Sequence, residues 1–253
     1  MTGQDPATFE KLTQIEAPRP TLIEGLPGHG LVASIAVDQI TEQLDLVHHG
    51  NIYDESFPRV VTFQEGIVRD PVRVYSGETP PVMTLQSDLA MPPETYGPLA
   101  RCVLGDLADD FDRAIFLAGA PAASDAARGN VTGVATHPEL RDELEATGID
   151  LAMQPGIVGG VTGALVQACH QQQVPAAVLI VEAHPYLPDP GAAQGVIENA
   201  LEPLVDFDID TTELEKQAEE IQQRMQQIAE QYRRTVEDSS TGRSESAIPG
   251  MYQ

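Results

Sequence analysis

The amino-acid sequence predicts an α/β protein, a three-layer α/β/α sandwich around a mixed, mainly parallel sheet. Short apolar runs alternate with longer segments whose apolar residues recur at helical spacing, and this alternation is typical of that architecture. The run AAVLIVEA at residues 176–183 is continuously apolar, like strands that are buried on both faces of a parallel sheet. Three β-like runs follow one another between residues 58 and 87, which indicates that some strands are antiparallel.

The first part of the chain begins with the apolar run TLIEG at residues 21–25, which predicts a strand. The sequence PGHG breaks this run, and residues 31–44 then show apolar side chains at helical spacing, which predicts a helix. Gly, Pro and acidic residues separate the β-like runs that follow. The further strands expected here are residues 45–50, 59–64, 72–76 and 82–87.

The alternation continues through the rest of the chain, and proline and glycine mark several boundaries. Pro138 stands near the start of one helical segment and Gly148 follows its end, which are the positions where these residues are favoured. The expected strands are residues 113–120, 131–136 and 176–183, and the expected helices are residues 93–111, 137–148, 155–173 and 190–206. We do not find the eight strand–helix units of a barrel.

The last expected helix, from Asp210 to Thr235, carries a narrow apolar stripe. Asp210 followed by Glu213 is a capping-box-like start. A helix that faces a core usually has a wider stripe, so we interpret this one as a coiled-coil-like element that makes helix–helix contacts in a homo-oligomer. The expected oligomer contacts are Leu214, Ile221, Met225 and Ile228. The alternative is an amphipathic helix that packs on its own domain.

These observations divide the chain into three parts. Residues 1–206 form the α/β domain, residues 207–236 form a helical oligomerisation or projecting segment, and residues 237–253 form a flexible tail. Residues 237–250 are rich in Ser, Gly and charge and poor in bulky apolar groups, so we expect them to be disordered. As a flexible tether they would have a root-mean-square reach of roughly 20 Å.

The charge of the chain is strongly negative. Fourteen basic residues against 39 acidic residues give a formal net charge of −25, and Lys11 and Lys216 are the two lysines. Such a surface repels phosphate backbones, so nucleic acid is excluded as a partner. The acidic residues are spread along the chain rather than clustered, which favours adaptation to a high-salt cytoplasm over binding of one basic partner.

The composition also bears on the cellular compartment. The sequence has no apolar run of 18 residues or more, so we expect no membrane span, and its first residues do not resemble a signal peptide. Cys102 and Cys169 each lie in a helical pattern without a partner at disulfide or metal spacing. We therefore expect buried thiols in a reducing cytoplasm.

A glycine loop follows the first predicted strand and precedes the first predicted helix. Gly28, Gly30 and Ala33 fit a permissive form of the dinucleotide-binding fingerprint. The next strand, however, ends in His-His-Gly where that fingerprint requires an acid, and neither lysine lies near a glycine loop. A tight strand–helix turn is therefore favoured over a nucleotide site.

Glu182 and His184 are the best enzymatic candidates, because they end the most apolar strand, where α/β sheets place their ligands. With Gly28 and Gly30 they would form a ligand-binding edge, although a structural role is favoured for all four residues. Metal-ligand spacing is absent from the His and Cys pattern. We therefore expect no catalytic residue, no cofactor and no metal.

Four motifs, taken in order, resemble the proteasome assembly chaperone family in its archaeal branch. They are LIEGLPGHGLVAS, FLAGAP, PGIVGGVTGALV and EAHPYLPDPGAAQGVIENAL, and the resemblance covers roughly residues 20–206. It implies a phosphorylase-like α/β fold without a recognised catalytic activity. It also implies a homo-oligomer that binds proteasome α subunits.

The last three residues have a meaning within this resemblance. Proteasome activators and some assembly chaperones end in a three-residue sequence: a hydrophobic residue, a tyrosine and then any residue. This sequence inserts into pockets between neighbouring α subunits. Met251, Tyr252 and Gln253 match that pattern. The alternative function is a small-molecule enzyme, a hydrolase or phosphorylase-like protein, that uses the glycine-loop edge of the sheet.

The charge generates the first testable prediction. Repulsion among the carboxylates opposes the compact state, and salt screens this repulsion. We expect the melting temperature to rise steeply between dilute buffer and molar potassium chloride, as measured by circular dichroism. A flat profile would contradict the assignment to a high-salt cytoplasm.

Overall fold

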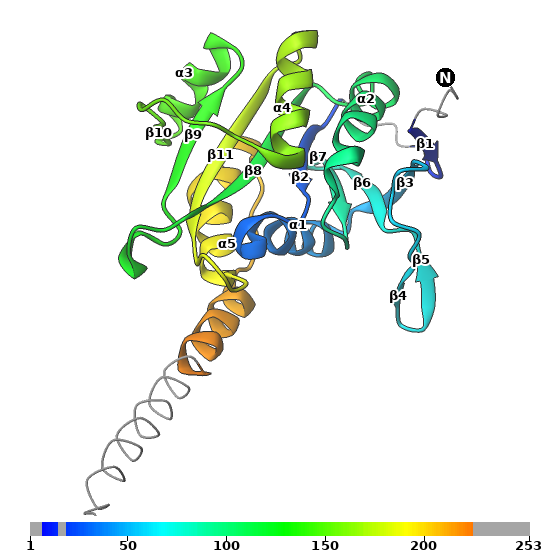
Figure 1. Cartoon of the computed structure of the whole chain (residues 1–253). Coiled ribbons are helices and arrows are strands. Elements are labelled where there is room, and N and C mark those ends of the chain that lie inside the picture. Colours follow the sequence, from blue (N-terminus) through cyan, green and yellow to red (C-terminus); the bar gives the residue numbers. More distant parts are fainter. Residues whose placement is uncertain (1–6, 15–18, 225–253) are drawn as a thin grey trace, which may run out of the picture.

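The computed structural model describes residues 7–14 and 19–224 of the chain (Figure 1). These residues form an α/β fold with one nine-stranded mixed sheet and a separate two-stranded hairpin. The sequence predicts an α/β fold with a mixed sheet, and both are confirmed. Within the described part of the chain, no helix is both long enough and apolar enough to cross a membrane.

The large sheet has the strand order β1-β3-β6-β7-β2-β8-β11-β9-β10. Its strands are β1 (Thr8–Lys11), β2 (Thr21–Gly25), β3 (Val47–Tyr53), β6 (Val72–Glu78), β7 (Pro81–Ser87), β8 (Arg113–Pro121), β9 (Val131–Ala135), β10 (Asp150–Leu151) and β11 (Ala176–Ala183). Strands β4 (Thr62–Gln64) and β5 (Ile67–Arg69) pair with each other and form the separate hairpin. The sequence patterns did not predict β1, β5 and β10.

The prediction of a mainly parallel sheet is wrong. The four parallel pairs are β7–β2, β2–β8, β8–β11 and β9–β10. The other four pairs, β1–β3, β3–β6, β6–β7 and β11–β9, are antiparallel. A connection as short as the one between β6 and β7 can join only antiparallel neighbours, because parallel strands need a long crossover.

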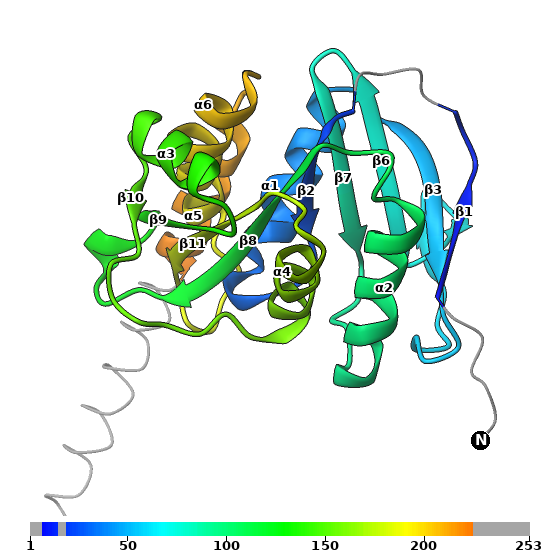
Figure 2. The same cartoon turned by 90° about the horizontal axis from the view of Figure 1, so that it is seen from above.

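Helices lie on both faces of the sheet (Figure 2). They are α1 (Val32–Gln43), α2 (Tyr96–Asp106), α3 (Pro138–Ala146), α4 (Gly160–Gln172), α5 (Pro190–Val196) and α6 (Glu202–Val205). A π-helical turn, Ile197–Leu201, joins α5 to α6, and a further helix spans 212–224. The helices α2 and α4 cover one face, and α1, α3, α5 and α6 cover the other.

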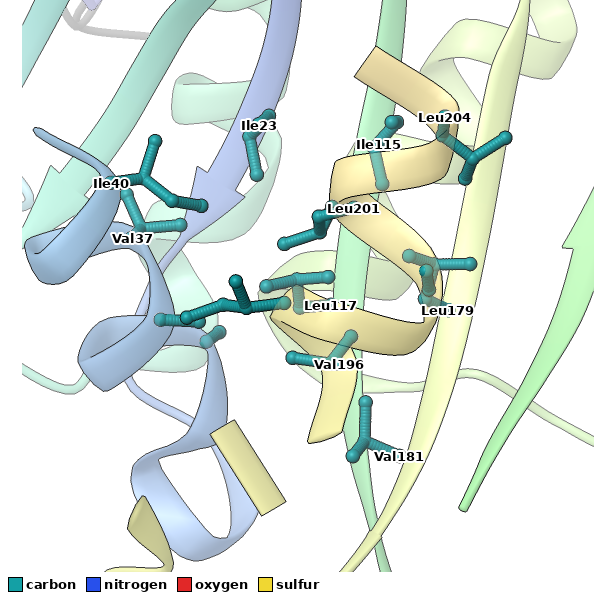
Figure 3. Close-up of a cluster of buried hydrophobic side chains, with 14 of the residues drawn as sticks. Ile23, Val37, Ile40, Ile115, Leu117, Leu179, Val181, Val196, Leu201 and Leu204 are labelled. Carbon is teal, nitrogen blue, oxygen red and sulfur yellow. The ribbon is translucent and has the colours of Figure 1, made fainter. Parts of the chain in front are cut away.

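Each face of the sheet has its own apolar core. On one face, Val37 and Ile40 of α1 meet Ile23 and Leu117 of the sheet together with Leu201 of the π-helical turn (Figure 3). These side chains are at most 3% exposed. The two cores together leave the central strands covered on both sides, which explains their continuous apolar sequences.

The second core contains both cysteines. Cys102 of α2 and Cys169 of α4 are free and buried, which confirms the prediction of buried thiols. Burial raises the pKa of each thiol to about 12. Both sulfurs are therefore protonated at neutral pH and have little nucleophilic character.

The start of the C-terminal helix belongs to the core of the α/β domain. Phe207, Ile209 and Leu214 pack into the same apolar cluster as α1 and α5, so the packing crosses the expected boundary at residue 206. Leu214 is 1% exposed, which leaves no surface for a second subunit and corrects its expected role as an oligomer contact. Asp210 Oδ1 accepts a hydrogen bond from Thr212 N at 3.0 Å, near the helix start that the sequence indicates.

Candidate functional site

The parallel strands β2, β8 and β11 end at one side of the sheet, which we call the carboxyl edge. Open α/β sheets place their ligand sites at this edge. Three loops meet there: residues 26–31 after β2, residues 122–130 after β8 and residues 184–189 after β11. The four candidate ligand residues, Gly28, Gly30, Glu182 and His184, belong to these loops or to the strand ends that lead into them.

The loop after β2 packs directly against its neighbours. Gly30 has a φ of +64°, and a Cβ atom there would lie 2.9 Å from the Cβ of Ala183. A Cβ on Gly119 of β8 would lie 2.3 Å from the carbonyl oxygen of His29. Glycine is therefore favoured at Gly30 by the positive φ and the nearby Ala183 side chain, and at Gly119 by the close approach of the His29 backbone. This geometry agrees with the favoured interpretation of a tight strand–helix turn.

Asp189 is a buried carboxylate that connects the loops of the carboxyl edge. Its side chain is 0% exposed and accepts two hydrogen bonds from the Arg128 guanidinium, at 2.8 and 2.6 Å. It also accepts from the backbone N–H groups of His184, at 2.7 Å, and Ala192, at 3.1 Å. Its own N–H donates to the carbonyl of Gly30 at 2.9 Å. The side chain and the backbone N–H of this one residue thus tie three loops to the start of α5.

The charge state of Asp189 follows from these contacts. Burial alone would raise its pKa, but the hydrogen bonds from Arg128 and from the two backbone N–H groups lower the pKa below its ordinary value. The group is therefore ionised at neutral pH and paired with Arg128. Its contacts with Arg128, His184 and Ala192 hold the loops after β8 and β11 to the start of α5.

Glu24 is a second buried carboxyl at the same edge. It is 0% exposed, and its oxygens accept from Leu26 N at 3.2 Å and from Leu117 N at 3.4 Å. The hydroxyl of Thr162, in the first turn of α4, lies 3.4 Å from Oε1. Burial raises the pKa of Glu24 to about 8, against the lowering effect of these hydrogen bonds. The side chain is therefore mostly protonated at neutral pH.

A cavity of about 330 Å³, which we call the edge cavity, lies at the carboxyl edge. Its walls come from the glycine loop after β2, the end of β8 and the segment 157–162 that begins α4. The lining is largely apolar and includes Met91, Leu117, Val161 and Ile180. Thr162 forms part of this wall and connects it to Glu24. No described group of His, Cys, Asp and Glu side chains is arranged to hold a metal ion.

The four candidate ligand residues do not share one cavity. Gly28 lines the edge cavity, whereas His184 lines a separate groove beside the C-terminal helix. Glu182 accepts from Asn130 Nδ2 at 3.2 Å and from Ala123 N at 3.4 Å, so it fastens the loop after β8. His184 Nδ1 accepts from the N–H groups of Tyr186 and Leu187, both at 3.1 Å. The geometry therefore gives Glu182 and His184 loop-forming contacts.

The sequence analysis missed Glu24, Asp189 and Arg128. Two signals were present. Glu24 is the one charged residue of the otherwise apolar or neutral run TLIEG, which indicates a buried carboxyl if that run is a central strand. Asp189 stands between two prolines, directly before a helix, which is typical of an N-cap followed by proline at the first helical position. The pairing of Asp189 with Arg128, 61 residues away, has no local signal.

Comparison with known proteins identifies the family. Residues 22–229 match the PAC2 family. The chain belongs to the PAC2 family. This match includes all four motifs on which the resemblance rested, and it confirms the family-level interpretation of the sequence.

Three other proteins are similar to this chain along most of their length. PbaA of Pyrococcus furiosus, an archaeal homologue of proteasome-assembly chaperone, is 25% identical with a TM-score of 0.76, covering 91% of this chain and 100% of PbaA. PbaB of the same organism, an archaeal proteasome activator, is 20% identical with a TM-score of 0.78, covering 88% and 99%. An uncharacterized protein of Methanocaldococcus jannaschii is 28% identical over 235 residues, covering 93% of this chain and 96% of that protein.

The four PAC2-like motifs meet at the carboxyl edge. LIEGLPGHG supplies Glu24 and the glycine loop, and FLAGAP supplies Gly119. PGIVGGVTGALV supplies Thr162 and the start of α4, and EAHPYLPDPGAAQG supplies Asp189. Segments that are far apart in sequence therefore build one structural unit. In this PAC2 chain the unit is explained by packing and hydrogen bonding among its own residues.

The buried ion pair generates a prediction on stability. Asp189→Ala leaves Arg128 without its carboxylate and removes the cap of α5, so we expect the free energy of unfolding to fall by about 3–5 kcal/mol in urea titrations. Glu145→Ala is the control, because Glu145 is half-exposed in a surface pair with Arg141. It should change stability by less than about 0.5 kcal/mol. Equal losses in the two variants would contradict the role of Asp189.

Glu24 generates a prediction on pH dependence. Its pKa is about 8 in the folded state against an ordinary value of 4.5, so between these values the folded state binds more protons than the unfolded state. Stability from this group is complete below pH 4.5 and is lost as the pH rises towards 8, by up to about 1.4 kcal/mol per pH unit. Glu24→Gln removes this dependence.

The measurement is the difference in unfolding free energy between parent and Glu24→Gln at pH 5, 6, 7 and 8. The parent should lose stability relative to the variant at each step. Glu145→Gln, at a half-exposed site, serves as the control and should run parallel to the parent. A constant difference for Glu24→Gln would show that the carboxyl is not protonated in the folded protein.

Proposed function

We propose that this PAC2 protein is a proteasome assembly chaperone or proteasome-binding factor that engages proteasome α subunits. The observation that carries the proposal is the fold shared with PbaA, an archaeal homologue of proteasome-assembly chaperone, over the whole of that protein. The similarity to PbaB, an archaeal proteasome activator, supports the same assignment. The scattered positions of Gly28, Gly30, Glu182 and His184 give no support to the enzymatic alternative.

The docking element in this proposal is Met251, Tyr252 and Gln253, which lie outside the described residues. The ring of Tyr252 supplies apolar area and a hydroxyl, and a terminal carboxylate can pair with a basic group in the receiving pocket. The helix 212–224 projects from the body at the carboxyl edge (Figure 1), so it carries the chain away from the sheet before the tail begins.

The proposal extends to the oligomeric state of the protein and to its cellular compartment. The protein acts as a homo-oligomer in the cytoplasm of a halophilic archaeon, and several tails on one oligomer add avidity. Ile221 is half-buried in the described structure, while Met225 and Ile228 lie outside it, so their contacts with another subunit stay a prediction. The proposal assigns no catalytic activity.

A binding experiment with purified proteasome α subunits tests the docking element. Tyr252→Ala removes the ring, and one alanine added after Gln253 moves the terminal carboxylate out of register. We expect each change to weaken binding by at least about tenfold, because a buried tyrosine and its paired charge are typical interface hot spots. The dissociation constant is measured by biolayer interferometry with the α subunits immobilised.

The control is Tyr186→Ala, which removes a tyrosine that is 89% exposed on the body. This variant should bind like the parent, and all variants should melt at the parent's temperature. If either tail variant binds as tightly as the parent, the tail is not the docking element. If the parent itself does not bind α subunits, the assignment to the proteasome is wrong.

A further inference from the structure

The edge cavity differs in charge from other pockets of the described chain. Its lining contains no Asp, Glu, Lys or Arg side chain. Four other pockets of the described residues each have at least one carboxylate in their lining. In a chain with 39 acidic residues and a net charge of −25, a cavity of about 330 Å³ without a carboxylate is unusual. The lining of this cavity therefore does not repel an anion.

The edge cavity lies where the connections of two neighbouring strands leave the sheet in opposite directions. Strands β2 and β7 are parallel neighbours. The chain continues from β2 into α1, which packs in one apolar core, and from β7 into α2, which packs in the other (Figure 2). The cavity is lined by residues 27–29, which follow β2, and by Ala90 and Met91, which follow β7. Open α/β sheets bind their ligands outside the carboxyl ends of the strands at such a point.

A further wall of the edge cavity is the start of α4. Residues 157–162 line the cavity, and α4 begins at Gly160. No side chain caps this helix, and no described residue accepts a hydrogen bond from the backbone N–H of Gly160, Val161 or Thr162. The N–H groups and the dipole of a helix N-terminus favour a carboxylate or phosphate beside them. The first turn of α4 thus offers unpaired donors at the wall of a cavity without acidic side chains.

The glycines before and at the start of α4 leave open space beside these donors. A Cβ atom on Gly159 or Gly160 would meet no described atom within 4 Å beyond its chain neighbours and its own helix. Gly160 has a φ of +69°, which favours glycine. Gly159, however, has a φ of −112°, a conformation that any residue adopts. Neither packing nor backbone conformation therefore explains a glycine at position 159.

A buried polar atom of the lining residue His29 is a second, independent sign of a ligand. Its Nε2 is buried and has no hydrogen-bond partner among the described residues. Buried polar atoms in folded proteins nearly always have a partner, so this nitrogen points to a partner from outside the chain. Thr162 adds a hydroxyl to the lining. The pKa of about 8 keeps Glu24, to which this hydroxyl bonds, mostly protonated at neutral pH, so Glu24 adds little negative charge there.

The remaining lining of the edge cavity is apolar. It includes Met91, Tyr96, Leu117 and Ile180. Mostly apolar walls with a few converging polar groups are the usual form of a small-molecule site. The cavity therefore suits a ligand that has an apolar body as well as a polar head.

We propose that the edge cavity binds a small organic anion, in which a carboxylate or phosphate head is joined to an apolar body. The head lies at the first turn of α4 and accepts hydrogen bonds from its N–H groups, and the body covers the apolar lining. The proposal assigns no reaction to the site. The site is separate from the C-terminal docking element, so the proposal does not rest on the assignment to the proteasome.

The test titrates the full chain with phenylacetate and, separately, with phenyl phosphate in an isothermal calorimeter. The salt concentration is the lowest at which the parent stays folded, because salt screens the charge of the probe. We expect millimolar or tighter binding of at least one probe, and the tighter one identifies the preferred head. Phenylacetamide, which is neutral and has the same shape as phenylacetate, should bind at least about tenfold more weakly than the better anion. Acetate, which lacks the apolar body, should be weaker by a similar factor.

Two variants that add a ring to the lining locate the site. Gly159→Phe and Ala90→Phe should each weaken binding of the better probe by at least about tenfold, because the new side chain takes up cavity space. Gly156→Phe is the matched control: a Cβ there also meets no described atom within 4 Å, but this glycine is not part of the lining. It should bind like the parent. Circular dichroism checks that each variant is folded.

Three results would overturn the proposal. The first is that neither anion binds the folded parent at millimolar concentration. The second is that phenylacetamide binds as tightly as the better anion. The third is that the folded lining variants keep the affinity of the parent, or lose no more of it than Gly156→Phe does, since the probe would then bind elsewhere.

Discussion

The buried carboxylate of Asp189 is the interaction on which the carboxyl edge depends. Removing a carboxylate from water is costly unless ionic and hydrogen-bonding partners compensate, and here Arg128 and two backbone N–H groups do so. The partners come from the loop after β8, the loop after β11 and the start of α5. Because the Asp189 N–H also bonds to Gly30, the glycine loop after β2 has its position set by the same residue.

The direction of the C-terminal helix follows from this arrangement. Asp189 caps α5, and the chain then runs through the π-helical turn and α6 to residue 206. Glu198 of that turn accepts a hydrogen bond from Thr211, and Leu214 is buried in the core. Two contacts therefore fix the first turn of helix 212–224 on the body. The groove beside this helix keeps its shape for the same reason, since one wall belongs to the loop that Asp189 holds.

Sequence patterns predicted the central strands and most helices, because periodicity reports which side chains are buried. They did not predict β1, whose residues Thr8–Lys11 are mostly exposed and gain their structure by pairing with β3, about 40 residues later. They also assigned Leu214 to a subunit interface. An apolar stripe on a helix shows that one face of the helix is covered, but it does not show whether the same subunit or another one covers it. Glu182 and His184 were placed correctly at a strand end, but their contacts depend on loops that fold back over them.

Several arginines form ion pairs within the subunit, and this leaves a surface that is mainly acidic. Arg73 pairs with Asp88, Arg113 with Glu143, and Arg128 with Asp189, so these cations stabilise the subunit itself. The surface that remains is mainly acidic, and copies of such a surface repel one another. At high salt the repulsion is screened within a few ångströms, and association must then come from apolar area and short-range pairing.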